Sequence, residues 1–573
     1  MTRRDSLATT HPDRRVRPEA IPGRTRQRRG WEASGSAWWR WVTAIPVAAL
    51  ALGALVAACG TPPGDAGQRT ASRSASPSPF ASEGTSAGVS TSPDAAASPD
   101  ASGGPPAGPV ALAVVSGFDN YAVTSVTRDD LASRLASGTL IIPCGAESAV
   151  AGALRSTGAG ATTCVAADHI TEVLAPSSTA LALLPPALVT PRVKVVPLEG
   201  ADLFGEKPAR TTAYPLIIAR PPTWPAAWSA WTASDVRVVV TTGVNCPDRG
   251  VSHQTVVLRK GWDWLLQAGT ARYTGTHWFA PMGWYVVDAV RTGHAGALLA
   301  LLKNADVTVS DFECPMTRSF TQHDTGTSFS IDPRVAAMMA TAGFDVATIG
   351  ADHNTNAGLA AVGETVDDFR ANHIQPTGAG RTLDEALRPA VVDANGITFG
   401  FVGFDAIGGS TYATATTPGV APLTLVNAEA AIARAKAAGA QVIIALPQWS
   451  NTEYHANFTA FQDRLTALLF NAGADDIVGA DFHWAGGVWI TRTGSTYRYV
   501  GASQGNFWFG QDWSRQTEEG VITSLTFVGT KLVQVRLTPT VVLDNAQVNL
   551  IDPATDGQFV LRQVLDASTL PSK

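Results

Sequence analysis

The segment 343–356, GFDVATIGADHNTN, limits the fold of this chain more than any other stretch. It opens with a glycine after a helix that we predict over 335–342, continues as a short apolar run, and ends with Asp352 and His353. This order is typical of a buried parallel strand that carries polar groups into a crevice. A carboxylate and an imidazole are both ligands of divalent cations. The alternative is that Asp352 and Asn354 only form a turn.

Three other apolar runs, at 307–310, 442–446 and 477–480, end in the same kind of chemistry. Helical segments separate the runs, so we predict an α/β domain in which the loops at the carboxyl ends of the strands share one metal-like site. The polar and aromatic residues that follow these runs are Asp311, Glu313, Gln448, Trp449, Asp481 and His483.

Five motifs in a fixed order resemble one family. They are SDFECP (310–315), GFDVATIGADHN (343–354), PTGAGRTLDEA (376–386), the segment 451–484 and SQGNFWF (503–509). Their order is similar to that of the bacterial CapA family of capsule or poly-gamma-glutamate synthesis proteins. The resemblance covers 236–573 and implies a calcineurin-like metallophosphatase fold, which is an α/β four-layer sandwich of two sheets with an α+β tail.

The resemblance also implies roles for particular residues. His353 would act as general acid, with Asn506 as a second catalytic residue. The metal ligands carried over by position are Glu313, Asp352, Gln448, Asp481 and His483, and the residues expected to contact substrate are Asp311, Trp449, Glu453 and Trp484.

The chain departs from the family pattern at its presumed ligands. The family has a carboxylate after the glycine of its first strand, whereas Val244 follows the glycine here. Asp352 replaces an asparagine, Gln448 a histidine, and Asp481 the first histidine of an H-x-H motif. A site so rich in oxygen favours Mn²⁺, Mg²⁺ or Ca²⁺ over Zn²⁺. The alternative is a site that has lost its metal.

The N-terminal region has the composition of an export signal. Residues 1–58 are rich in arginine, 41–58 are uncharged and mostly apolar, and Cys59 follows. We predict a signal over 1–58 and a lipid on Cys59 that anchors the chain at the extracytoplasmic face of the cell membrane. A plain transmembrane anchor is the alternative. Residues 59–109, rich in Ser, Ala, Pro and Gly, are predicted to be a disordered tether.

The charge distribution argues against nucleic acid as a partner. The net charge is −6, and residues 1–58 contribute ten arginines and four acids, so the remainder has 32 basic and 44 acidic residues, or −12. Nucleic-acid binding proteins carry the opposite sign.

Residues 110–235 predict a smaller α/β domain. Apolar runs at 111–116, 139–143, 180–184 and 193–196 are expected strands, and 128–135 is an amphipathic helix. The region is similar to one lobe of periplasmic substrate-binding proteins. That similarity implies ligand capture, and a spacer domain is the alternative.

The cysteines fit an exported protein. Apart from Cys59 four remain, and an even number in an oxidising compartment favours two disulfides. Cys144 and Cys164 lie in the smaller domain. The strands before Cys246 and Cys314 are neighbours in the family fold, so the resemblance implies that these two pair. A metal site with cysteine ligands is the less favoured alternative.

An aromatic-rich segment lies between Gly250 and Asp306. Aromatic side chains over a crevice can form a platform for sugar rings or polymer chains, or they can be the core of a lid. The aromatic residues concerned are Trp262, Trp264, Tyr273, Trp278, Trp284 and Tyr285.

Two classes of function follow. The first is a metal-dependent hydrolase of the cell envelope, acting on a phosphoester or a gamma-glutamyl amide while a capsule or poly-gamma-glutamate-type polymer is made, anchored or trimmed. The second is a non-catalytic lipoprotein that binds envelope polymer in the same crevice. Bound metal in stoichiometric amount distinguishes the first class from the second.

Overall fold

The computed structural model describes residues 108–156, 164–174, 179–450 and 452–570. The predicted export signal, the lipid site at Cys59 and nearly all of the tether lie outside the described residues. The described residues fall into one compact unit. None of their helices is both long enough and apolar enough to cross a membrane.

The smaller α/β region is built on a 5-stranded sheet with the order β4-β3-β5-β2-β6. The predicted helix at 128–135 is α1, where Thr127 and Asp130 form a capping box. The other predicted elements are also confirmed. The bounds are β1 (Pro109–Ala111), β2 (Ala113–Gly117), α1 (Arg128–Ala136), β3 (Leu140–Pro143), α2 (Glu147–Ala153), β4 (Cys164–Val165), α3 (Ile170–Leu174), β5 (Leu181–Leu184), β6 (Val193–Val195), α4 (Lys207–Thr211) and β7 (Ile217–Ala219).

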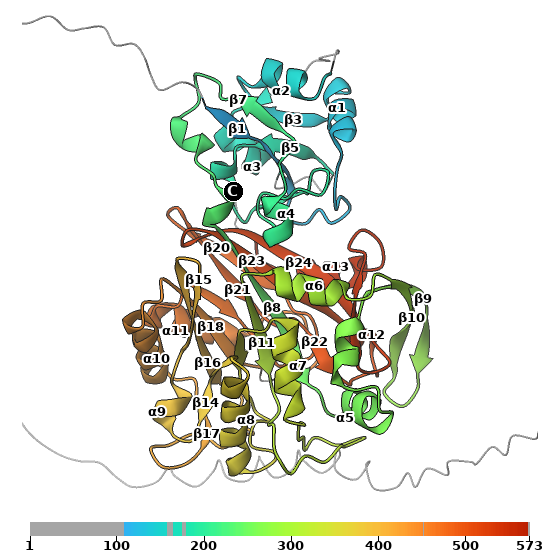
Figure 1. Cartoon of the computed structure of the whole chain (residues 1–573), viewed down its shortest axis with the longest axis vertical. Helices are drawn as coiled ribbons and strands as arrows, with labels where there is room; N and C mark the ends of the chain where they lie inside the picture. Colours follow the sequence, from blue (N-terminus) through green and yellow to red (C-terminus); the bar gives the residue numbers. More distant parts are fainter. Residues whose placement is uncertain (1–107, 157–163, 175–178, 451, 571–573) are drawn as a thin grey trace, which may run out of the picture. The chain divides into compact units, whose positions relative to one another are not determined.

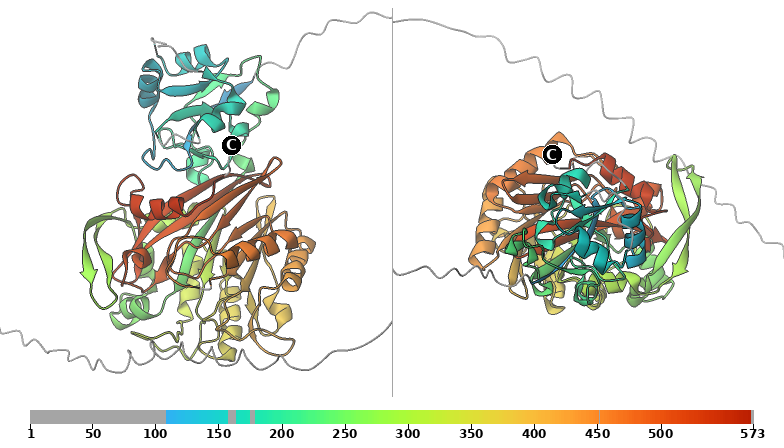
Figure 2. Two further views of the ribbon diagram at one scale, coloured as in Figure 1. Left: turned by 180° about the vertical axis from the view of Figure 1, so that it is seen from behind. Right: turned by 90° about the horizontal axis from the view of Figure 1, so that it is seen from above.

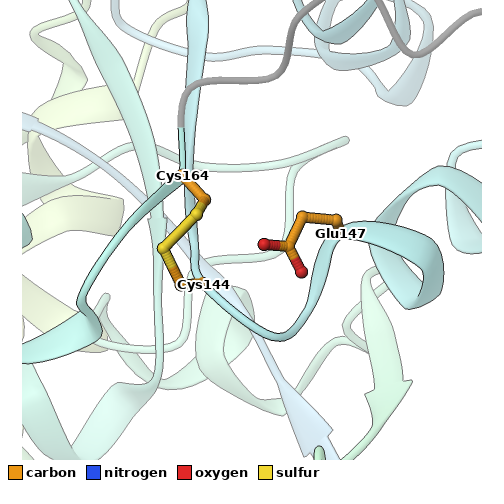
Figure 3. A group of neighbouring side chains, drawn as sticks. All are labelled: Cys144, Glu147 and Cys164. Carbon is orange, nitrogen blue, oxygen red and sulfur yellow. A yellow bond between two sulfur atoms is a disulfide. The ribbon is translucent and has the colours of Figure 1, made fainter.

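Cys144 and Cys164 are joined in this region, with their Cα atoms 4.8 Å apart. Figure 3 shows the disulfide next to Glu147. Because each sulfur is bonded to the other, neither is a free thiolate for a metal ion. The pairing is the one that the sequence favoured.

The rest of the described chain contains a 10-stranded sheet with the order β10-β9-β25-β24-β23-β8-β11-β12-β13, and β22 also pairs with β8. Strands β8, β11, β12 and β13 run parallel, so their carboxyl ends share one edge. The bounds are β8 (Val236–Cys246), β9 (Thr270–Phe279), β10 (Trp284–Gly293), β11 (Val307–Phe312), β12 (Val346–Thr348), β13 (Gln375–Thr377), β22 (Asn506–Phe509), β23 (Glu519–Val528), β24 (Lys531–Leu543) and β25 (Gln547–Ile551).

A second, 6-stranded sheet has the order β15-β16-β18-β19-β21-β20. Its inner strands β16, β18, β19 and β21 are parallel, and β15 and β20 are antiparallel edges. The bounds are β15 (Ala390–Ala394), β16 (Ile397–Asp405), β18 (Val442–Gln448), β19 (Asp476–Val478), β20 (Val488–Thr493) and β21 (Thr496–Gly501), with a small ribbon of β14 (Ala379–Gly380) and β17 (Gly419–Val420).

Helices cover the outer faces of both sheets (Figure 1). Helices α6, α7 and α8 pack on the first sheet, and α10 and α11 pack on the second. The bounds are α5 (Arg249–Ser252), α6 (Ala297–Asn304), α7 (Arg334–Ala342), α8 (Leu359–Ala371), α9 (Leu383–Ala386), α10 (Leu425–Ala437), α11 (Ala460–Ala472), α12 (Arg515–Glu518) and α13 (Gln558–Asp566).

The alternation along β8 shows why four layers form. Val240 points into the core shared with the helices, which includes Met339 of α7. Its neighbour Val239 points the other way, into the core between the sheets, with Phe399 and Ile444. Successive side chains of a strand face opposite sides, so an entirely apolar strand must be buried on both. Helix, sheet, sheet and helix therefore follow one another, which confirms the predicted metallophosphatase-like fold class.

The segment 343–356 has the predicted local structure. Helix α7 ends at Gly343, whose φ of 91° lies in the left-handed region that favours glycine. Strand β12 follows and pairs in parallel with β11. Asp352 and His353 come four and five residues after Thr348, the last residue of β12, so they lie at the crevice edge of the first sheet.

The aromatic-rich segment forms a long hairpin of β9 and β10 that stands away from the body as an arm (Figure 2). The aromatic residues of the segment differ in burial, and their role as a platform for polymer chains stays a prediction. Trp262 is buried in the helix-side core, whereas Trp278 and Tyr285 are 54% and 58% exposed and contact each other edge to face.

Candidate functional site

Residues from both sheets meet at the carboxyl ends of their strands. Glu313 follows β11 and Asp352 follows β12 in the first sheet, whereas Gln448 ends β18 and Asp481 follows β19 in the second. Fixed elements thus bring together four of the residues that the resemblance had placed in a metal site.

Glu313, Asp352 and His353 form the tightest group. Their potential ligand atoms all lie within 4.8 Å of one another, and Asp352 Oδ2 is 3.6 Å from His353 Nε2. The Gln448 amide connects two of them, because its Nε2 donates to Glu313 Oε1 at 3.2 Å and its Oε1 accepts from the Asp352 backbone N–H at 2.6 Å. These two bonds make Gln448 a positioning residue for the carboxylates, and its role as a metal ligand stays a prediction.

Several buried oxygens in this group have no hydrogen-bond partner among the described residues. They are Asp311 Oδ2, Glu313 Oε2 and Asp352 Oδ1. Burial raises the pKa of Asp311 to about 7 and that of Asp352 to about 6, and burial followed by the charge of Asp352 raises the pKa of Glu313 well above its usual value. Unpartnered buried polar groups are rare and call for a bound partner.

Asn354 is fully buried, and neither its amide oxygen nor its amide nitrogen has a hydrogen-bond partner among the described residues. An asparagine that served only to form a turn would bond to nearby backbone groups. The turn-only alternative for this segment is therefore disfavoured.

Asp481 is close enough to the other carboxylates of the site for their charges to affect its pKa. Burial, followed by the charges of Asp352 and Glu453, raises the pKa of Asp481 well above its usual value. Glu453 is exposed, which suits a residue at the mouth of the site.

Sequence reasoning missed Asp405, the last residue of β16. Asp405 pairs in register with Gln448, and its Oδ2 is buried without a partner among the described residues. Burial raises its pKa to about 7. The signal was present, since an aspartate ends the apolar run at 398–404 just as polar residues end the other runs.

Two histidines are held in one tautomer by asparagines. His353 Nδ1 is 2.9 Å from Asn356 Oδ1, and His483 Nδ1 is 3.0 Å from Asn506 Oδ1. Each amide oxygen is an acceptor, so each Nδ1 carries the proton and each Nε2 is left as an acceptor. Burial lowers the pKa of His483 to about 3 and also lowers the pKa of His353.

The role predicted for Asn506 changes with this geometry. Its Nδ2 donates to Gln511 Oε1 and to the Thr517 carbonyl, both at 3.0 Å, and the side chain is buried. All its polar atoms are therefore engaged within the protein, and Asn506 is a positioning residue for His483.

The predicted tryptophans differ in their access to substrate. Trp449 is fully buried, and its Nε1–H donates to the Ala502 carbonyl at 2.9 Å, so the expectation that it contacts substrate is wrong. Trp484 is half-buried, 6.1 Å from Trp284 of β10 and 6.3 Å from Tyr454 between ring centroids. The tip of the hairpin, where Trp284 follows the turn, therefore adds an aromatic wall beside Tyr454 and His483.

Strained backbone is concentrated around the site. Arg249, Tyr454, Asp481 and His483 have φ values of 45°, 60°, 116° and 60°, in or beyond the left-handed region. Such conformations are held only when the surrounding structure fixes them, and they gather at functional sites.

The end of β8 carries no free carboxylate. The side chain of Asn245 donates to the Ser310 hydroxyl at 2.9 Å and to the Gly243 carbonyl at 3.0 Å, and it accepts from the Trp508 backbone N–H at 3.4 Å. Asn245 is thus part of the strand framework.

The donor set fits a divalent cation. Carboxylate oxygens without partners among the described residues, from Glu313, Asp352 and their neighbours, are ligands of the kind that Mg²⁺, Mn²⁺ and Ca²⁺ take. The Nε2 of His483 can add a neutral nitrogen, and the Nε2 of His353 is free either to bind the ion or to move a proton.

The fold and the site together define a four-layer α/β protein of the metallophosphatase type with a polar site shared by its two sheets. Residues 282–511 match the family described as bacterial capsule synthesis protein PGA_cap. The chain is 25% identical over 249 residues to the PGA biosynthesis protein CapA of Bacillus subtilis (strain 168). That alignment covers 42% of this chain and 64% of CapA.

Solved structures are similar only at a distance. A 5'-nucleotidase precursor from Thermus thermophilus is 13% identical, covers 57% of each chain and has a TM-score of 0.31. The calcineurin-like phosphoesterase YfkN from Bacillus subtilis is 14% identical, covers 57% of this chain and 98% of that one, and has a TM-score of 0.26.

Proposed function

We propose that this chain is a cell-envelope hydrolase of capsule-type polymer synthesis that works with one divalent cation. The observation that carries the proposal is the group formed by Glu313, Asp352 and His353, whose ligand atoms lie within 4.8 Å of one another while buried carboxylate oxygens remain without partners among the described residues. Buried like charges repel unless a cation or a proton compensates them.

Glu313, Asp352, Asp481 and His483 would hold the ion, and Gln448 would keep the first two in place. A bound divalent cation supplies Lewis acidity toward a phosphoryl or acyl oxygen of the substrate. The oxygen-rich donor set favours Mn²⁺, Mg²⁺ or Ca²⁺ over Zn²⁺.

His353 would move the proton. Its Nδ1–H is held by Asn356, so Nε2 is the atom that takes up and returns a proton. Its pKa is lowered by burial, which keeps the imidazole neutral and ready to accept a proton at neutral pH. Phe329 packs edge to face on the ring at 4.7 Å and fixes its orientation.

The substrate class follows from the family. A polymer of the capsule or poly-gamma-glutamate type, cut at a phosphoester or a gamma-glutamyl amide, suits the family description and the name of CapA. Glu453, Tyr454 and Trp484 would contact a polymer chain that enters the site, since Glu453 is exposed and the other two are half-buried.

A titration of metal ions tests the proposal. We expect calorimetry on the full chain to detect one site for Mn²⁺, Mg²⁺ or Ca²⁺ and weaker binding of Zn²⁺. The double variant Asp352→Asn with Asp481→Asn should weaken binding by about tenfold or more, because charged ligands are removed. Asp463→Asn, an exposed aspartate of α11, is the control and should bind like wild type. Equal binding by wild type and the double variant contradicts the proposal.

The placement in the envelope is a proposal of its own. Cys59 would carry a lipid, with 59–109 as the tether that holds the enzyme off the membrane. We expect Cys59→Ala to leave the chain unprocessed or to release it from the membrane fraction. Membrane extraction and gel mobility unchanged from wild type would refute the lipid anchor.

A non-catalytic polymer-binding protein is the second candidate. Its support is Asn245, which stands near the position of the family's first carboxylate and is fully engaged with the strand framework. Retention of purified poly-gamma-glutamate by a chain that binds no metal would favour this candidate.

A further inference from the structure

Arg249 is a buried cation close to the carboxylate group and was not among the predicted site residues. It opens α5 just after β8, and its side chain and backbone are 9% exposed. Its charge acts on His353 and on His483, and the charge of Glu313 acts on it in turn. The guanidinium therefore belongs to the same pocket of charge as the proposed metal ligands.

Two phenyl rings fix the guanidinium. Its Cζ lies 4.8 Å from the centroid of Phe329 and 5.1 Å from that of Phe509. The same rings support the two histidines, since His353 is 4.7 Å from Phe329 and His483 is 5.3 Å from Phe509. Three nitrogen-bearing side chains are thus arranged around one aromatic pair.

The Arg249 guanidinium forms no ion pair within the described residues. Its Nε and Nη2 donate to the Gly326 carbonyl, with a distance of 3.1 Å from Nε. Its Nη1 is buried and has no hydrogen-bond partner among the described residues, and none of their ion pairs includes Arg249. A buried donor on a charged group destabilises the fold when it has no hydrogen-bond acceptor. Arg249 also has a strained backbone, with a φ of 45°, so we infer that its Nη1 is kept for an acceptor that a ligand brings.

The site therefore has two faces of opposite character. One face offers the oxygens of Glu313, Asp352 and Asp481, which suit a cation. The other offers the Arg249 guanidinium, whose planar fork of donors matches the two oxygens of a carboxylate or phosphate. A substrate that carries an anionic group next to its reacting bond would satisfy both faces at once.

We propose that Arg249 binds an anionic oxygen group of the substrate, a phosphate or a carboxylate, beside the carboxylates that hold the cation. The inference deepens the proposed function and rests on it for the place of the cation. It makes Arg249 a determinant of specificity for acidic polymers over neutral ones, because a neutral sugar chain offers no partner for the buried charge.

The test is calorimetry on the full chain with two probes, inorganic phosphate and tri-gamma-glutamate, each with and without Mn²⁺. Arg249→Met keeps the length and apolar packing of the side chain and removes the charge, whereas Arg249→Lys keeps a charge without the fork. Arg498→Met is the matched control, since Arg498 of β21 also stacks on an aromatic ring, with its Cζ 4.8 Å from the centroid of Phe470 in α11. Circular dichroism melts confirm that each variant is folded.

Wild type and Arg498→Met should bind at least one probe, Arg249→Met should bind it about tenfold or more weakly, and Arg249→Lys should lie between them. Binding of phosphate alone supports a phosphoester group, and binding of tri-gamma-glutamate alone supports a polymer carboxylate. Equal binding by wild type and Arg249→Met overturns the inference, as does a wild type that binds neither probe.

The Mn²⁺ titrations of the same samples separate this inference from the proposed function. If Arg249→Met binds Mn²⁺ and both anions as wild type does, only the role of Arg249 is wrong. If wild type binds the anions but no metal, and Arg249→Met no longer binds the anions, the proposed hydrolase is wrong and the anion site stands.

Discussion

Two loops at the same edge of the first sheet each carry a buried carboxylate, and the two carboxylates differ in how fully they are hydrogen-bonded. In the loop after β8, Asp248 Oδ1 accepts from the N–H groups of Arg249 and His323 at 2.9 and 3.0 Å and from the Ser252 hydroxyl at 3.2 Å. Its Oδ2 accepts from Ser330 N–H at 3.1 Å and lies 2.6 Å from His323 Nδ1. In the loop after β11, Glu313 Oε2 is equally buried and has no partner among the described residues.

The difference separates a structural carboxylate from one kept for a ligand. A carboxylate whose oxygens all accept hydrogen bonds within the protein stabilises its loop and has no oxygen free to bind a ligand. A carboxylate that is left unsatisfied destabilises the metal-free chain and becomes useful when a cation arrives. Asp248 also fixes the backbone of Arg249, so the saturated loop presents a buried donor that has no partner among the described residues.

The largest effect is expected at Asp248. Asp248→Ala should lower the free energy of unfolding by about 3–5 kcal/mol, because it leaves several buried donors without an acceptor. Urea denaturation measures the loss, with Asp324→Ala, an exposed aspartate that also contacts a histidine, as control. A loss for Asp248→Ala no greater than that for Asp324→Ala would remove the contrast between the two loops.

An effect of opposite sign is expected at Asp481. With metal removed by a chelator, Asp481→Asn should raise the free energy of unfolding by about 1–3 kcal/mol, because it deletes an uncompensated buried charge and because asparagine tolerates a positive φ.

The gain at Asp481 should depend on pH. Since the pKa of Asp481 is raised in the folded state, its ionisation penalty is present above that pKa and is relieved as the pH falls through it. The stabilisation by Asp481→Asn should therefore grow as the pH rises and disappear as the pH falls toward the pKa of an unfolded aspartate, about 4. A stability loss at every pH would place Asp481 with Asp248 as a structural carboxylate.

The smallest expected effect is the difference in stability lost when one or the other disulfide is removed. Cys246 and Cys314, with Cα atoms 5.2 Å apart, join the β8 loop to the β11 loop across a sequence separation of 68, whereas Cys144 and Cys164 close a separation of 20. Removal of either by paired Cys→Ala changes should destabilise by about 2–4 kcal/mol, and the longer loop should lose about 1 kcal/mol more.

The disulfide comparison is read from thermal melts of both double variants after peptide mapping has established the pairs in the exported protein. Free thiols at Cys246 and Cys314 in that sample would contradict the pairing. A greater loss from the short loop would show that strain or contacts outweigh the entropy of loop closure.

Local sequence was sufficient for the elements of the fold. Gly343 after α7 and the apolar runs of β11, β12 and β18 each depend on a few neighbouring residues, and all were predicted near their observed positions. The hairpin of β9 and β10 was not predicted, because its aromatic residues were interpreted only as a platform for polymer chains or as the core of a lid.

The sequence by itself determined which strand ends carry donors, since an apolar run followed by Asp, Glu or His is a property of adjacent residues. Only the tertiary structure decided what each donor does. Trp449 is a core residue, Asn506 and Gln448 hold other side chains, and Arg249 keeps a nitrogen without a partner among the described residues, because hydrogen-bond partners come from strands far apart in the sequence. Saturation of a polar group is a property of its surroundings in space, and that property separates the framework from the site.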